Sequence, residues 1–397
     1  MTNWKTYKIG DLCKISSSKR IFAKEYKDSG IPFYRGKEII EKQKGNKIST
    51  ELYISQERYD EIKAKHGVPQ MGDMLLTSVG TLGIPYIVQD EVFYFKDGNL
   101  TWFYNFEGID SRYLYYWFLS PIGKMNIDSK AIGSTQKALT IETLSKFEIS
   151  LPGLEEQRRI AGILGAIDDK IENNRRINAN LELQAQALYK QWFVDNHSDD
   201  SEEMPLDKIA LHITDGVHNT VVDTPDGDGY LLSCKNIKNG QLHIDNNERR
   251  ISAETLSRLR KRTRLDQGDI LLTSVGTIGE MLLINEYPSN YEFQRSVAII
   301  KPNPQLVSSY FLYSALLYKK AEIKHLAHGA VQQCIFISDL KEFLVDVPNF
   351  EIITSFDSIV APLFDTITKM QKENKVLTNL RDTLLPKLMN GEMEEVV

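Results

Sequence analysis

The chain has 397 residues, of which 42% are hydrophobic and 26% charged, and its formal net charge is −6 at pH 7. This length is sufficient for two domains with separate cores, and the composition excludes disordered and fibrous classes of protein. The first residues are polar and the densest apolar run, Tyr113 to Leu119, is too short to cross a bilayer. We therefore expect neither a secretory signal nor a membrane span, and a cytoplasmic location.

Basic residues are concentrated in two stretches of this acidic chain. Residues 1–47 hold twelve lysines and arginines against five acidic residues. A solvated surface is the ordinary explanation for such clusters, but a DNA backbone needs only a local basic face. The net negative charge therefore leaves DNA binding open. The second cluster comprises Arg249, Arg250, Arg258, Arg260, Lys261, Arg262 and Arg264.

The first 150 residues predict a mixed α and β domain. Residues 55–66 have helical spacing behind a serine at the N-cap position, and Asp110 to Leu119 returns to that spacing. Between these helices, short runs rich in β-branched and aromatic residues predict strands separated by glycine turns. The expected strands are residues 74–77, 84–88, 92–95 and 100–106.

The chain repeats itself at an offset of 196 residues. Gly72 to Gly83 recurs as Gly268 to Gly279 with ten of twelve positions identical. Such self-similarity indicates two copies of one structural unit. The second copy accordingly predicts helices at 252–263 and 309–319. The same register relates Gly133 to Gly329, Gln136 to Gln332, Leu144 to Leu340, Phe147 to Phe343 and Pro152 to Pro348.

The repeat divides the chain into four segments. Residues 1–152 form a first domain (head 1), and residues 197–348 form a second (head 2). Each head is followed by a long helix, at residues 153–196 and 349–397. The predicted fold class is therefore α+β, with two tandem pseudo-symmetric domains separated by two long helices.

Both helical segments have apolar residues at alternating steps of three and four, which is a heptad seam. Neither helix can bury its seam alone, so we expect the two to pack as an antiparallel coiled coil. The alternative is that each helix packs only on its own head. Asn178 and Asn374 are equivalent seam positions, where a polar pair would fix the register. The predicted interface residues are Ile160, Leu164, Ile167, Ile171, Asn178, Leu181, Leu188, Phe356, Val360, Leu363, Ile367, Asn374, Leu377 and Leu384.

The sequence advertises no catalytic or metal site. The repeated Ser-Val-Gly-Thr loop lacks the Gly-Lys-Ser/Thr of an ATP-binding loop, and its glycines instead predict a strand bend with positive φ. No Asn/Asp-Pro-Pro-Tyr/Phe tetrapeptide of an adenine methyltransferase is present. Cys13, Cys234 and Cys334 lie far apart, and His325 and His328 lack further ligands at zinc spacing. We therefore expect a non-catalytic chain without a metal.

The combination of motifs resembles the specificity subunit of type I restriction–modification systems. The resemblance covers essentially the whole chain: the duplicated Gly72 to Gly83 motif, Gly133-x-x-Gln136, and Leu151 to Gln157 leading into a long helix that ends in Ala187 to Asp195. The second copy departs from it with Pro348 to Ile353, and its helix contains Pro362 and Pro386.

The resemblance implies a function and a set of partners. Each head would be a target-recognition domain that reads one half of a split DNA site. The helices would separate the heads and dock two modification (methyltransferase) subunits, which carry S-adenosylmethionine. Two restriction (motor-nuclease) subunits using ATP and Mg²⁺ could join them. The chain itself would hold no cofactor and would bind double-stranded DNA.

Given this resemblance, basic and amide side chains suited to phosphates and base edges are the predicted DNA contacts. In head 1 they are Lys19, Arg20, Arg35, Lys37, Gln136 and Lys137. In head 2 they are His218, Asn219, Lys235, Asn236, Arg260, Lys261, Arg262, Gln294, Arg295 and Gln332. The glycine bend adds Ser78, Thr81, Ser274 and Thr277 as possible contacts to the DNA backbone.

Two other classes of function remain as alternatives. A coiled-coil scaffold whose duplicated domains bind protein partners would give no sequence-selective DNA footprint. A methyltransferase or nuclease with unrecognised motifs would act on DNA as the purified chain alone.

Overall fold

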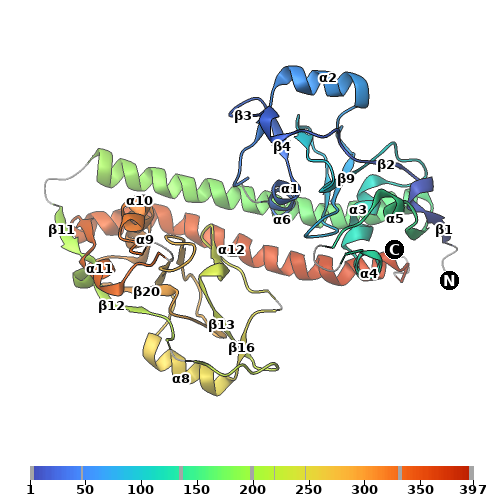
Figure 1. Cartoon of the computed structure of the whole chain (residues 1–397). Coiled ribbons are helices and arrows are strands. Elements are labelled where there is room, and N and C mark those ends of the chain that lie inside the picture. The colour runs from blue at the N-terminus through green and yellow to red at the C-terminus, as the bar shows by residue number, and fades with distance from the viewer. Residues whose placement is uncertain are drawn as a thin grey trace. The chain divides into compact units, whose positions relative to one another are not determined.

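The structure is a computed structural model that describes residues 4–45, 48–133, 137–196, 201–218, 220–245, 247–329 and 333–392. The chain forms two compact units. Unit 1 comprises Met1–Asn173 and Glu373–Val397, and unit 2 comprises Asn174–Lys372. Each unit contains one head and a portion of both long helices (Figure 1). The chain is α+β, as predicted.

Head 1 is built on two small sheets. The first has the order β2-β9-β6-β7 with antiparallel neighbours. The second has the order β3-β5-β4-β8, in which β4 and β8 are parallel. A separate pair, β1 and β10, joins the two ends of the head. The strands are β1 (Lys5–Lys8), β2 (Lys14–Ser16), β3 (Tyr26–Lys27), β4 (Ile31–Tyr34), β5 (Tyr53–Ile54), β6 (Met74–Thr77), β7 (Pro85–Ile87), β8 (Tyr94–Phe95), β9 (Leu100–Tyr104) and β10 (Glu148–Leu151).

The helices of head 1 begin where polar side chains can cap them. Ser55 caps α2 by accepting from the Arg58 amide, as predicted, and Asp110 caps α3. Helices α1, α4 and α5 were not predicted. The helices are η1 (Ile9–Asp11), η2 (Ala23–Glu25), α1 (Gly36–Gln43), α2 (Gln56–His66), α3 (Ser111–Leu119), α4 (Pro121–Lys130) and α5 (Ile141–Ser145).

Head 2 repeats this architecture. Its main sheet has the order β12-β20-β17-β18, which matches β2-β9-β6-β7 strand for strand, and β11 with β21 matches β1 with β10. Its second sheet has the order β16-β13-β19. The strands are β11 (Glu202–Pro205), β12 (Ala210–Asp215), β13 (Gly229–Leu232), β14 (Ile237–Lys238), β15 (Gln241–Leu242), β16 (Arg250–Ile251), β17 (Ile270–Thr273), β18 (Met281–Leu283), β19 (Tyr291–Phe293), β20 (Val297–Pro302) and β21 (Leu344–Val347).

The heads differ most clearly in the segment after β4 of head 1 and after its counterpart β13 of head 2. Head 1 has α1 there, whereas head 2 has the short helix η4 followed by the β14–β15 hairpin. Ser252 caps α8 as Ser55 caps α2. The helices of head 2 are α7 (Leu206–Ile209), η4 (Cys234–Asn236), α8 (Ala253–Thr263), α9 (Ser309–Tyr318), α10 (Lys320–His325) and α11 (Ile337–Glu342).

Two long helices follow the heads: α6 (Leu154–Lys190), which continues into a π-helical turn at Gln191–Asp195, and α12 (Phe350–Met389). Pro362 and Pro386 both lie inside α12, which runs on through them as one helix. Every predicted interface residue on these helices is buried or half-buried, because each lies on the seam. Among the described residues, no helix is long and apolar enough to cross a membrane.

In unit 1, the first half of α6 packs antiparallel to the end of α12. The Arg381 guanidinium lies 2.9 Å from Asp168, and the Asn374 side-chain amide donates to the Ile171 carbonyl at 3.4 Å. Residue numbers therefore decrease along α12 as they increase along α6, which makes the pair antiparallel. Leu385 and Leu388 of α12 share the core of head 1. The alternative in which each helix packs only on its own head is therefore wrong.

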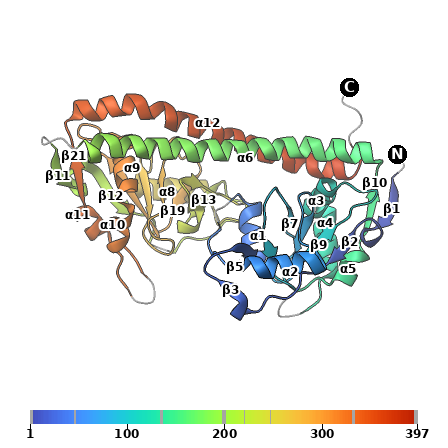
Figure 2. The same cartoon turned by 90° about the horizontal axis from the view of Figure 1, so that it is seen from above.

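In unit 2, the second half of α6 packs antiparallel to the beginning of α12. The Phe193 ring lies 5.1 Å from that of Phe356, and Ala185 shares a core with Val360 and Ile367. The predicted antiparallel pairing is thus present inside each unit (Figure 2). It explains why the seam persists over both helices.

The start of each long helix is tied to its head differently. The Gln157 side chain accepts from the Asp110 amide at 3.0 Å and donates to the Pro152 carbonyl at 2.9 Å. Its counterpart in the repeat, Ile353, is fully buried among apolar residues. A hydrogen bond from the Ser308 hydroxyl to Asp357, at 2.8 Å, adds the polar tie there. In the second copy, an apolar side chain therefore takes the place of Gln157, and the polar tie is made by Asp357 instead.

Candidate nucleic-acid interface

The repeated motif forms a strand followed by a tight turn in each head. Gly80 and Gly83 have φ of +80° and +74°, and Gly276 and Gly279 have +78° and +84°, as the sequence predicts. A Cβ at Gly83 would lie 2.3 Å from the Ile127 side chain, so any other residue would have to displace that side chain and adopt a strained positive φ.

In head 1 this turn draws together segments that are distant in sequence. The Gly80 amide donates to the Lys137 carbonyl at 3.2 Å, and the Ser78 amide donates to the Asn99 carbonyl at 2.8 Å. The start of α1, at Gly36, faces the Thr77 side chain. We call residues 78–83, 96–99, 35–37 and 137–138 the loop face of head 1.

Head 2 repeats the arrangement. The Ile335 amide donates to the Ser274 carbonyl at 2.9 Å, and the Ser274 amide donates to the Ser296 carbonyl at 3.0 Å. The Ser296 hydroxyl in turn accepts from the Cys234 amide at 3.0 Å, at the start of η4. We call residues 274–279, 294–296, 233–235 and 333–335 the loop face of head 2.

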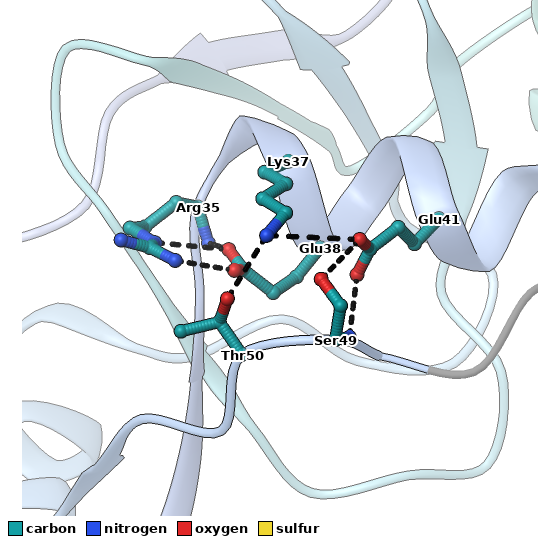
Figure 3. Close-up of polar contacts among 6 residues, drawn as sticks. All are labelled: Arg35, Lys37, Glu38, Glu41, Ser49 and Thr50. Atoms are coloured by element: carbon teal, nitrogen blue, oxygen red, sulfur yellow. Dashed lines mark hydrogen bonds and ion pairs between the residues drawn. The ribbon is translucent and has the colours of Figure 1, made fainter. Parts of the chain in front are cut away.

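Arg35 and Lys37 begin α1 at the loop face of head 1 (Figure 3). The Arg35 guanidinium donates to Glu38 at 2.6 Å, and the Arg35 amide donates to the same carboxylate. Burial acts to raise the pKa of Glu38, but these hydrogen bonds hold that pKa below its ordinary value. The Lys37 ammonium donates to the Thr50 hydroxyl at 3.0 Å and is more than half exposed.

Several other predicted contacts reach solvent at or beside these faces. In head 1, Lys19, Arg20, Thr81 and Lys137 are exposed. In head 2, Thr277 and Arg295 are exposed and Gln294 is half-buried. His218 is exposed beside Asp215, and Lys235 is exposed with its ammonium 3.0 Å from Glu248.

Helix α8 borders the loop face of head 2 through one arginine. The Arg262 guanidinium donates to the Asp215 carbonyl at 2.8 Å and to the Gly216 carbonyl, next to His218. Lys261 is exposed. Burial, and to a lesser extent the nearby Arg264, Lys341 and Lys301 cations, lower the pKa of His212 on the adjacent strand.

The sequence profile described as "Type I restriction modification DNA specificity domain" matches residues 1–183 and 233–379. The chain belongs to this family. It is a specificity subunit of a type I restriction–modification system, the non-catalytic component that recognises a DNA sequence.

Individual relatives match either nearly the whole chain or about half of it. The type I restriction enzyme MjaIX specificity subunit of Methanocaldococcus jannaschii is 26% identical over 98% of this chain and 94% of its own. A putative type I specificity subunit of Haemophilus influenzae, S.HindORF215P, is 34% identical over 47% of this chain and 46% of its own. The crystal structure of the S subunit from M. genitalium has the same fold, with a TM-score of 0.60 at 18% identity, covering 100% of this chain and 97% of that one.

Some predicted contacts of this specificity subunit require correction. The hydroxyls of Ser78 and Ser274 do not face a DNA backbone, because both residues are buried. Ser78 instead hydrogen-bonds to the Thr101 hydroxyl at 2.6 Å. Asn236 is also buried, and its side chain accepts from the Ser233 amide and donates to the His243 carbonyl.

Two predicted arginines have structural partners. The Arg260 guanidinium forms an ion pair with the fully buried Glu292 and donates to the Pro288 carbonyl at 2.6 Å, so it holds α8 against β19. Arg35 is held by Glu38, as described above, and about a third of its side chain remains exposed. Gln136, Asn219 and Gln332 lie outside the described residues.

Sequence reasoning missed the aspartate of the repeated motif. Asp73 accepts from the Trp102 ring nitrogen at 2.9 Å, and Asp269 accepts from Lys301 at 2.6 Å. Each therefore ties the start of the central strand to the neighbouring strand. The signal was present in the sequence as an aspartate that both copies of the motif retain beside a glycine.

No metal-binding group appears in the described ranges. Within them, three or more His, Cys, Asp or Glu side chains never gather at one point. His328 instead faces Asp339 at 2.8 Å. The surfaces that remain for function are the two loop faces and the exposed basic side chains around them.

Proposed function

We propose that each head reads one half of a two-part DNA target, and that the chain holds two methyltransferase subunits and two restriction subunits on that target. The observation that carries this proposal is the pair of loop faces. The same sheet and the same glycine turn support both, while the side chains displayed there differ, with Lys37 and Lys137 in one head and Lys235 and Arg295 in the other.

Shared scaffolds with different surface side chains suit two independent readings. Arginine, lysine, asparagine and glutamine supply donors for phosphates and base edges, and their placement on turns lets the contacts change while the sheet is kept. Because both heads belong to one chain, the second contact is intramolecular, so two short readings combine into one selective site.

The long helices have a place in the same proposal. Each belongs to both units, so their length sets the number of unread base pairs between the two half-sites. A heptad inserted into α6, with a matching heptad in α12 to keep the seam, changes the gap and leaves both half-sites unaltered. A changed half-site with an unchanged gap contradicts this role.

The chemistry is assigned to the partners. S-adenosylmethionine belongs on the methyltransferase subunits, and ATP and Mg²⁺ belong on the restriction subunits. The chain itself contributes recognition and placement, with no cofactor of its own.

Methylome sequencing of the source cell, with and without this chain, tests the proposal. We expect one two-part motif to lose methylation when the chain is absent. The same motif should be protected in a footprint by the complex of purified chain and methyltransferase subunits. Methyl transfer by the chain alone would favour an enzyme, and an unselective footprint in the presence of the partners would favour a protein-binding scaffold.

A further inference from the structure

The segment between β2 and β3 of head 1 displays an aromatic ring. Phe22 is 55% exposed, whereas the preceding residue, Ile21, is 4% exposed and packs in a core with Phe33 and Tyr59. Single exposed apolar residues are common on protein surfaces. Two further features suggest a function for the exposed Phe22 ring: the loop that carries it is anchored on both sides, and two lysines flank it in the sequence.

The loop is fixed on the side before Phe22. The Lys19 amide donates to the Tyr94 hydroxyl at 2.6 Å, and the Arg20 guanidinium lies 2.7 Å from Asp97. Both partners belong to β8 or to the turn that follows it, at the edge of the loop face. The backbone that leads to the ring is therefore anchored to the sheet.

The loop is also fixed on the side after Phe22. The Phe22 amide donates to the Glu25 carboxylate at 2.8 Å, and the Glu25 amide donates back to the Phe22 carbonyl at 2.9 Å. The same carboxylate lies 3.0 Å from the Arg58 guanidinium of α2. Phe22 is thus presented on a turn tied to two elements, and binding through its ring costs little further ordering.

Two lysines lie close to Phe22 in the sequence. Lys19 and Lys24 are exposed on either side of Phe22 in the sequence, and among the described residues no carboxylate lies within 4.0 Å of either ammonium. The segment leading into β3 lies on the side of head 1 turned away from α6 in both views (Figures 1 and 2). An exposed ring with a lysine before it and another after it in the sequence matches a base flanked by two phosphates.

We propose that Phe22 is a wedge that stacks on a base at an opened step of the duplex half-site read by head 1, while Lys19 and Lys24 contact the adjoining phosphates. This inference rests on the proposed function and names a residue and a mode of reading for it. The energy needed to open a base step depends on its sequence, so a ring that stacks in the opened step adds sequence preference without a hydrogen bond to a base edge.

Head 2 has a different side chain in the matching segment between β12 and β13. Val222 is 80% exposed there, but it is followed by Asp223, Asp226 and Asp228. An acidic segment with an aliphatic tip repels a phosphate backbone. We therefore assign the wedge to head 1 alone.

The test uses the specificity subunit assembled with its methyltransferase subunits and the DNA target found by methylome sequencing. 2-Aminopurine is placed at successive positions of the head 1 half-site, apart from the methylated base, and its fluorescence reports unstacking. We expect a fluorescence rise at one step with the unaltered complex. Phe22→Ala abolishes that rise and weakens binding roughly five- to a hundredfold, the effect of removing one base–aromatic stack.

Matched variants separate stacking from other causes. Phe22→Trp keeps the signal, whereas Met71→Ala, which removes another exposed apolar side chain of head 1 (75% exposed), leaves signal and affinity unchanged. An abasic site at the responding step strengthens binding of the unaltered complex, because the cost of unstacking is already met, and does not strengthen binding of Phe22→Ala.

Three results would be decisive against the wedge or its premise. Equal affinity and equal fluorescence for Phe22→Ala overturn the wedge. If Phe22→Ala no longer assembles with the methyltransferase subunits in the absence of DNA, Phe22 makes a protein contact and the wedge is overturned. Failure of the unaltered complex to bind the target at all is a different outcome, which rejects the proposed function itself.

Discussion

Head 1 and head 2 use the same aspartate in the same motif to bond to different partners. Asp73 accepts from the indole of Trp102, and Asp269 accepts from the ammonium of Lys301. The strand order and the glycine turn are unchanged around this exchange. The comparison teaches that the backbone frame of a head is kept while the chemistry attached to it, polar or ionic, varies.

The same contrast extends to the surface helices. Helix α2 balances Arg58, Lys63 and Lys65 against three acidic residues, whereas α8 has four basic residues and only Glu254. One head is therefore near neutral along this helix and the other is strongly cationic. If the heads are independent readers, each difference should have effects confined to its own half of the target.

The largest effect is expected from exchanging a head. Replacing residues 1–152 with the corresponding domain of another family member should change one half-site completely and leave the other intact, as methylome sequencing would show. The exchange should include residues 373–392, because Leu385 and Leu388 complete the core of head 1. Altered reading of both half-sites would argue against independent heads.

The next effect separates the two equivalent helices by stability. Arg260→Ala leaves Glu292 buried without its cation, so we expect a loss of about 3–5 kcal/mol in the free energy of unfolding. Lys63→Ala, at the matching position of α2, removes an exposed side chain and should cost less than about 0.5 kcal/mol. Urea denaturation measures both, and equal losses would contradict the assignment of Arg260 as a structural residue.

Unit 2 should carry a pH dependence of stability that extends to neutral pH, because of Glu182. Burial against Gly240 and Tyr313 raises the pKa of Glu182 on α6 to about 7. The folded protein then holds a proton that the unfolded chain releases near its ordinary pKa of 4.5. The resulting stability is full below pH 4.5 and is lost as pH rises through 7, by on the order of 2 kcal/mol once solvent access to the side chain is allowed for.

The control for this pH dependence is Glu182→Gln. Denaturation between pH 4.5 and 8 should show that the free energy of unfolding of this variant falls less with rising pH than that of the unaltered chain. Thr378 stands at the matching position of α12 and cannot titrate. An unchanged curve for Glu182→Gln would show that another group is responsible.

The smallest effect concerns salt. The double variant Arg258→Gln, Lys261→Gln removes two exposed cations of α8 and should weaken DNA binding less than tenfold, while reducing the slope of log affinity against log salt by about 2. The matched variant Lys63→Gln, Lys65→Gln on α2 should change the slope by less than about 0.5, because acidic neighbours already offset those charges. Equal changes would remove the proposed electrostatic difference between the heads.

Local patterns in the sequence predicted much of the fold. The serine caps at Ser55 and Ser252, the central strands β6 and β17, the glycine turns and the helical seam all depend on neighbours within one or two turns of chain. The family resemblance then supplied the function. These features were predictable because periodicity and capping act over short stretches of sequence.

The fate of individual side chains was less predictable, because it depends on partners far away in sequence. Arg260 lies in an evident basic cluster, yet Glu292, its partner, is 32 positions later. Ser78 follows a strand whose two faces are both covered, so it is buried although it precedes a turn. Neither outcome can be predicted from the spacing of neighbouring residues in the sequence.

Unit 1 is formed by two segments that lie far apart in the sequence, and this has a consequence for biosynthesis. Its core needs residues from both sides of unit 2, since about 200 residues separate Asn173 from Glu373. At roughly 5–20 residues per second, a ribosome takes tens of seconds to cross that interval. All of unit 2 has been translated before α12 can cover Ile160 and Leu164. A nascent chain stalled in the interval therefore exposes an apolar strip, which chaperones or proteases can detect as a sign of incomplete synthesis.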